Sequence, residues 1–195
     1  MDAYREAEAF RFNLAQHERA HRWLPMLLDC YALVDYSVDR AISLSAEAVS
    51  CRKGCSSCCA HVIPLSTLEA VGISFYIREL LSPDIRAGLV RRLRTGVDTC
   101  LFNIDDVCVI YPMRPIACRR YLVTSRCCAP GENAALSRPE DILEPSREYL
   151  YAAVEMTLPF YPDGKHLPPD GKKAFEFYKK QNVLLSSVYA TILGL

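Results

Sequence analysis

The segment Cys51-Arg52-Lys53-Gly54-Cys55-Ser56-Ser57-Cys58-Cys59 places four cysteines in one short stretch, and the organisation of the chain follows from it. Cysteines two or three residues apart can bring their sulfurs within about 4 Å of one another through a single turn, as Zn–S bonds of about 2.3 Å require. Gly54 favours a tight loop in the first half. The spacing also fits one face of a helix. In either conformation the sulfurs converge.

A second group follows at Cys100, Cys108 and Cys118. The turn-forming residues between the first two predict a hairpin that brings Cys100 and Cys108 together. Pro115 favours a helix start, which would place Cys118 in a first turn, where the helix N-terminus favours a thiolate. The candidate metal ligands are therefore Cys51, Cys55, Cys58, Cys59, Cys100, Cys108 and Cys118.

Several cations lie close to these cysteines in the sequence: Arg52, Lys53, Arg114, Arg119, Arg120 and Arg126. Thiolates around Zn²⁺ or an iron–sulfur cluster leave a net negative charge, which neighbouring cations offset. The Arg114-Pro115 and Cys118-Arg119 placements put two of these cations close beside the thiolate at Cys118. We therefore expect these two arginines to help bind the cofactor.

The remaining cysteines lie outside the two groups. Cys30 lies near Leu27 and Leu28 on the apolar face of a helix, which is typical of a packed thiol. Cys127 and Cys128 could complete a second metal centre, act as a redox pair or pack as buried thiols.

The N-terminus is charged from its first residues and lacks the basic and apolar regions of a secretory signal, which predicts a cytoplasmic protein. Cytosolic thiols stay reduced, so clustered cysteines there bind metal or do redox chemistry more often than they form disulfides. Lys plus Arg and Asp plus Glu both number 23, so no net field attracts nucleic acid or an anionic membrane. No apolar run is long enough for a transmembrane helix. The expected partner is a metal ion or cluster, and the sequence names no protein partner.

The length of 195 residues predicts a single domain, 1–195, with a mainly α fold: a helical scaffold around an irregular cysteine-rich segment. The metal-binding core is expected at about 51–128. Helices flank it at 2–50 on the N-terminal side and at 146–194 on the C-terminal side.

Local signals predict the helix boundaries. Ser66 and Glu69 form a capping box that opens a helix to about Leu81, and Ser82-Pro83 opens the next, which ends at Thr95 before Gly96. Residues 97–138 are expected to be irregular, with a short strand. Further elements are predicted as that strand around Val107, Val109 and Ile110, a helix capped by Ser146 and reaching Leu158, and an amphipathic stretch over 172–193.

The two cysteine groups together resemble a bacterial and archaeal family whose pattern is CxxCxxCC followed by C-x-IY-x2-RP-x2-CR, a family described as zinc- or iron-chelating. The resemblance covers residues 51–121, with Cys108-Val109-Ile110-Tyr111, Arg114-Pro115 and Cys118-Arg119 matching the second motif. One departure is the three-residue gap between Cys51 and Cys55. The resemblance implies bound iron–sulfur or zinc, and related motifs occur in flagellin lysine N-methylases.

Three functions compete. A redox or accessory protein would carry an iron–sulfur cluster, expected to be a four-iron cluster held by four cysteines. A structural zinc protein would use Zn²⁺ to order residues 97–128, which otherwise lack an evident core. A radical enzyme is less favoured, because such enzymes need alternating strands and helices after the cysteine motif. No acid–base pair or phosphate loop identifies a reaction, so enzymatic activity is left open.

Overall fold

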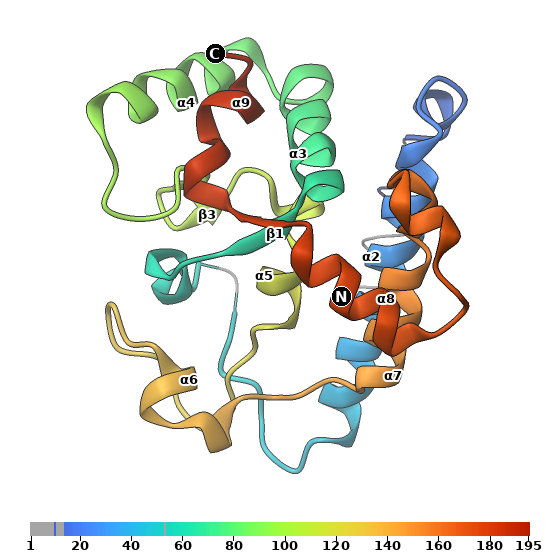
Figure 1. The fold of residues 1–195 in the computed structure, drawn as a ribbon. Coiled ribbons are helices and arrows are strands. Elements are labelled where there is room, and N and C mark those ends of the chain that lie inside the picture. Colours follow the sequence, from blue (N-terminus) through green and yellow to red (C-terminus); the bar gives the residue numbers. More distant parts are fainter. Residues whose placement is uncertain (1–9, 11–13, 53) are drawn as a thin grey trace.

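The computed structural model describes residue 10 and residues 14–52 and 54–195, and it is mainly α-helical, as predicted (Figure 1). The predicted N-terminal helices are represented by a helical turn at 14–18 and by the long helix α2; the start of the first lies outside the described residues. The helices are α2 (Trp23–Leu44), α3 (Thr67–Leu80), α4 (Pro83–Thr95), α5 (Ile116–Arg120), α6 (Ala134–Ser137), α7 (Arg147–Glu155), α8 (Gly171–Lys180) and α9 (Tyr189–Leu193). No helix of the described residues has the length and apolar character to cross a membrane.

The helical hairpin α3–α4 forms where the capping signals predicted it. The Ser66 side chain accepts a hydrogen bond from the Glu69 backbone N–H, and the Glu69 carboxylate accepts one from the Ser66 backbone N–H at 2.7 Å. Ser82 caps α4, Pro83 is its first residue, and Gly96 ends it with a φ of 82°. These boundaries are confirmed because the bonds that set them are local.

The C-terminal segment differs from the single amphipathic stretch that the sequence predicted. Helix α8 ends at Lys180, and the next residues form strand β4 (Asn182–Leu184) before α9 begins. Strand β4 pairs antiparallel with β1 (Pro64–Ser66), with Leu65 opposite Val183. The pairing carries α9 across to α3 and α4 (Figure 1). A partner distant in the sequence therefore interrupts a helical pattern.

The other strands form a hairpin of β2 (Asn103–Ile104) and β3 (Val107–Cys108). Asp105 and Asp106 turn the chain with positive φ angles of 50° and 60°, as short polar side chains tolerate. The predicted strand is shorter than expected. Val109 and Ile110 lie outside it, because the chain turns there and buries Ile110 in the core.

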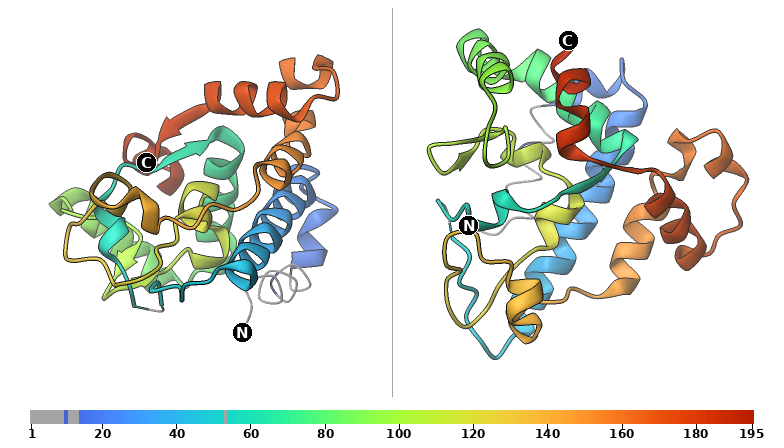
Figure 2. Two further views of the ribbon diagram at one scale, coloured as in Figure 1. Left: turned by 90° about the horizontal axis from the view of Figure 1, so that it is seen from below. Right: turned by 60° about the vertical axis from the view of Figure 1, so that its left-hand side comes forward.

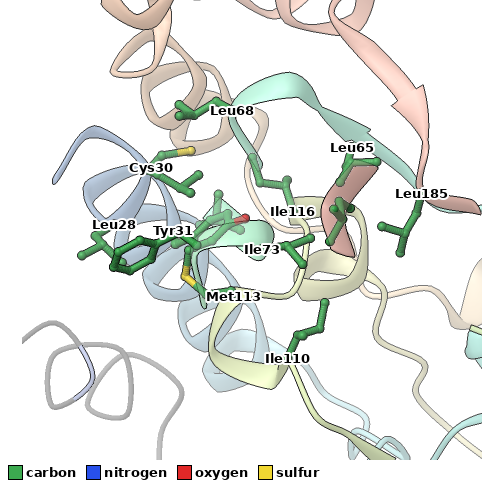
Figure 3. Close-up of a cluster of buried hydrophobic side chains, with 14 of the residues drawn as sticks. Leu28, Cys30, Tyr31, Leu65, Leu68, Ile73, Ile110, Met113, Ile116 and Leu185 are labelled. Atoms are coloured by element: carbon green, nitrogen blue, oxygen red, sulfur yellow. The ribbon is translucent and has the colours of Figure 1, made fainter. Parts of the chain in front are cut away.

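The cysteine-rich segment forms part of the main hydrophobic core, which contradicts the expectation that residues 97–128 lack one. Its apolar side chains are buried with those of the helices: Leu101, Phe102, Ile110, Met113 and Ile116. Figure 3 shows the last three in one cluster with Tyr31, Leu65, Ile73 and Leu185. These core positions could not be recognised from the sequence, because their spacing follows neither a helical nor a strand period.

Helix α7 begins after its predicted cap, Ser146, but ends at Glu155, before the predicted Leu158. A short 3-10 turn at Leu158–Phe160, which contains Pro159, replaces the last helical turn. Helix α7 packs against α2 on one side and α8 on the other (Figure 2). These three helices form the scaffold on which the cysteine-rich half rests.

Candidate metal centre

Five of the cysteines come from segments that the fold brings together, and we name them the inner group: Cys58, Cys59, Cys100, Cys108 and Cys118. The first two lie on a 3-10 turn, Ser57–Ala60. The backbone N–H of Cys100 donates to the Cys59 carbonyl at 2.7 Å, and the N–H of Asn103 donates to the Cys100 carbonyl. Because Asn103 pairs with Cys108, the hairpin returns Cys108 towards Cys100 as predicted. Cys118 lies in α5.

The thiols of the inner group influence one another's charge. The pKa of Cys108 is raised to about 11, mainly by burial and in part by the neighbouring Cys100 and Cys58. Burial likewise raises the pKa of Cys118, and the neighbouring Cys100, Cys58 and Cys108 add to this rise. Such coupling needs short separations, so these sulfurs share one region. The expected thiolate at Cys118 is wrong for the metal-free protein, because burial outweighs the short helix's N-terminus.

Cys58 is the exception among them. The Cys59 thiol donates a hydrogen bond to the Cys58 sulfur, which lowers the pKa of Cys58 to about 7 and raises that of Cys59. A hydroxyl from α9 reaches the same region: Tyr189 bonds the Cys100 side chain and accepts a hydrogen bond from the Leu101 backbone N–H at 3.1 Å. The C-terminal helix therefore supplies a polar contact that sequence reasoning missed.

Arg114 is the cation of the inner group. Its positive charge lowers the pKa values of Cys58, Cys108 and Cys118, although burial has a larger effect on each of them. Its guanidinium lies 4.0 Å from the centre of the Tyr111 ring. Its Nε is buried and has no hydrogen-bond partner in the described part of the chain. A partly buried cation whose Nε donor is unused, beside several sulfurs, fits a site that holds negative charge.

Arg119 points to the scaffold. Its Nη1 donates to Oδ2 of Asp35 at 2.6 Å, and the two side chains are only 5% and 3% exposed. Its Nε donates to the Arg114 carbonyl and its Nη2 to the Pro112 carbonyl. The guanidinium also covers the Tyr31 ring at 3.9 Å. Arg119 thus fixes the turn between Cys108 and Cys118 onto α2; its contact with a bound cofactor stays a prediction.

The other predicted cations have different surroundings. Arg126 pairs with Glu132 at 3.0 Å, and Arg120 lines a shallow depression with Pro145 and Leu150. Arg52 donates to the Cys127 sulfur at 2.9 Å. Lys53 lies outside the described residues.

A second set of thiols lies at the edge of the site, and we name it the outer group: Cys51, Cys55, Cys127 and Cys128. Burial raises the pKa of Cys51, and the nearby Cys55, Cys58 and Cys128 also raise it. The Cys127 sulfur lies 3.8 Å from the Ser50 carbonyl oxygen. Cys127 is exposed and the other three are partly buried. The predicted ligand Cys51 therefore lies near both Cys55 and Cys58, at the edge of the inner group.

The donor chemistry fits a thiophilic metal, since all ten cysteines are free and thiolates suit both zinc and iron–sulfur clusters. The side chains are not arranged as a finished site. Among residue 10 and residues 14–52 and 54–195, no three His, Cys, Asp or Glu side chains are placed to hold a metal ion. Thiols that hold a metal would first lose their protons, including the Cys59 proton that is now donated to Cys58.

Two remaining residues have clear surroundings. Cys30 is fully buried in the apolar core on α2, as predicted. The Nε2 atom of His61 lies 3.0 Å from the Glu132 carbonyl oxygen, and its ring packs edge-on against Tyr121.

Comparison of the chain with models of protein families, with curated proteins and with solved structures gave no match. The assignment of a function therefore depends on the residues of the site and on their arrangement.

Proposed function

We propose that this chain is a cytoplasmic metal-binding protein that holds an iron–sulfur cluster through the inner group of cysteines. One observation supports this above all others: five free thiols from separate segments lie in one region, and three of them, Cys58, Cys108 and Cys118, lie near the charge of Arg114, whose buried Nε has no hydrogen-bond partner among the described residues. Reduced thiols at this density are expected where the compartment keeps them reduced. A four-iron cluster needs four cysteines, so the inner group is sufficient for it.

Zinc is the alternative metal for the same thiols. Five clustered sulfurs exceed the four of a structural zinc site, and the adjacent Cys58 and Cys59 differ from simple zinc ribbons. The buried core of the cysteine-rich segment also removes the need for a metal to order it. Both considerations favour a cluster with a redox or accessory role over a structural zinc ion.

A radical enzyme is the weakest of the three readings. The described residues contain only two-stranded sheets, β1–β4 and β2–β3, in place of the alternating strands and helices such enzymes use. A bound cluster would supply one-electron transfer. The chain itself would supply charge compensation from Arg114 and a hydrogen bond from Tyr189 to the Cys100 sulfur.

The test is elemental analysis and visible spectroscopy of protein purified without oxygen. We expect bound iron and a broad visible absorption that dithionite bleaches. The Cys108→Ser/Cys118→Ser double variant should lose the cluster, because only three inner thiols remain, whereas Cys30→Ser, the same change at a buried thiol outside the site, should retain it. A colourless protein loaded with zinc would mean that zinc, the alternative metal, occupies the site in place of a cluster. Iron and zinc both far below one equivalent would refute the proposal.

A further inference from the structure

Glu69 makes more contacts than the capping box at the start of α3 requires. The residue is only 1% exposed, and both of its carboxylate oxygens accept hydrogen bonds. Oε2 accepts from the Ser66 backbone N–H at 2.7 Å and from the Tyr178 hydroxyl at 2.8 Å. Oε1 accepts from the Ile116 backbone N–H at 2.7 Å. One buried carboxylate therefore joins α3, α5 and α8, three helices that lie far apart in the sequence (Figure 1).

The contact with Ile116 holds the first residue of α5. The first N–H groups of a helix have no carbonyl partner within the helix. Ile116 is buried in the same cluster as Leu65 and Ile73 (Figure 3), so water does not readily replace the carboxylate as an acceptor. A buried backbone N–H without an acceptor costs free energy. The start of α5 therefore depends on a side chain from α3.

Helix α5 carries Cys118 between two anchors. The helix has only five residues, and Cys118 comes two residues after Ile116. The first anchor is the bond from the Ile116 N–H to Glu69, and the second is the ion pair of Arg119 with Asp35. In so short a helix, the position of the Cys118 sulfur depends on both ends being held.

We propose that Glu69 is a positioning residue for the inner group, because it holds the start of α5 and so sets where the Cys118 sulfur lies relative to the other inner sulfurs. The inference rests on the proposed function, in which Cys118 is a ligand. Residues that orient the ligands of a metal centre influence both its affinity for metal and its reduction potential. The capping box is visible in the sequence, but the partner of Oε1 lies 47 residues further along the chain.

The test compares Glu69→Gln with two control variants in the full-length, reduced, metal-free protein. A Gln side chain has one accepting oxygen and one donating nitrogen, so it cannot accept from donors on both sides. Ser66→Ala removes the hydroxyl that accepts from the Glu69 N–H at 3.3 Å, but it leaves all three contacts of the carboxylate. Tyr178→Phe removes one donor to Oε2 and leaves the bond to Ile116.

Two rates report on the start of α5. Glu69→Gln should speed hydrogen exchange of the Ile116 amide about tenfold or more relative to the amides of α2, because it loses a bond to a charged acceptor. It should also speed labelling of Cys118 by iodoacetamide relative to Cys30. Ser66→Ala and Tyr178→Phe should leave both rates close to those of wild type. In iron-loaded protein, Glu69→Gln should lose cluster absorption and shift the reduction potential, and Ser66→Ala should do neither.

Equal exchange of the Ile116 amide in wild type and Glu69→Gln would overturn the inference, as would unchanged labelling of Cys118. Wild-type protein decides the matter even where Glu69→Gln does not fold: a protected Ile116 amide supports the inference, and one that exchanges as fast as an exposed loop amide refutes it. Protein that binds neither iron nor zinc would defeat the proposed function, whereas the two rates in metal-free protein would still test Glu69.

Discussion

The buried ion pair between Arg119 and Asp35 gives the sharpest prediction about stability. Replacing Arg119 with Gln leaves the Asp35 carboxylate buried without its cation, and Oδ1 of Asp35 already has no hydrogen-bond partner among the described residues. Removing one partner of a buried ion pair costs about 3–5 kcal/mol. Domains of this kind are stable by only about 5–15 kcal/mol, so much of the stability should disappear.

The measurement is urea unfolding of the metal-free protein. Asp35→Asn should also destabilise it, but the Asp35→Asn/Arg119→Gln double variant should lose less than the sum of the single changes, because no charge is then left unpaired. Arg91→Gln, an exposed arginine on α4, is the matched control and should change the free energy of unfolding by under about 0.5 kcal/mol.

The same variants separate scaffold from site. If Arg119 acts by fixing the turn between Cys108 and Cys118, Arg119→Gln should lower metal retention and stability together. Arg114→Gln should lower metal retention with a smaller loss of stability, because Arg114 lies beside the sulfurs. An Arg119→Gln protein that unfolds at the urea concentration of Arg91→Gln would refute the role assigned to the ion pair.

Three further predictions concern other parts of the fold. Gly72→Ala should cost about 1–3 kcal/mol in thermal unfolding, because a Cβ there would lie 2.3 Å from a Leu27 methyl group, whereas Gly88→Ala, in open space on α4, should gain about 0.5–1 kcal/mol. The Lys173 backbone N–H lowers the pKa of Asp170, so the stabilisation from this carboxylate is present above its unfolded pKa of about 3.9 and is lost as pH falls through the folded value. Asp170→Asn should remove this acid dependence of stability. Parallel pH profiles of unfolding free energy for the variant and wild type would contradict the prediction. Cys108→Ser should retain its helical circular dichroism and be cleaved within 97–138 about as fast as wild type, because the apolar side chains of that segment are buried in the main core; clearly faster cleavage would mean that a bound metal orders the segment.

The sequence by itself determined the local elements. The capping residues Ser66 and Ser82 and the turn at Asp105 and Asp106 act on neighbours within a few residues, so their structures follow from the order of the chain. The same holds for Cys30, whose helical spacing identified it as a core residue. The clustering of Cys100 with Cys108 was also predicted, since a hairpin is a local structure.

Only the tertiary structure decided which cysteines share a region and which cations serve them. The Cys127 sulfur accepts a hydrogen bond from Arg52 and lies 3.8 Å from the Ser50 carbonyl oxygen, and nothing in either local sequence specifies these contacts. Arg119 turns to Asp35 on α2 because a buried guanidinium binds the nearest buried carboxylate, even though the sequence places it next to Cys118. Long-range packing sets these partners, and a one-dimensional pattern records spacing along the chain but carries no distance between segments.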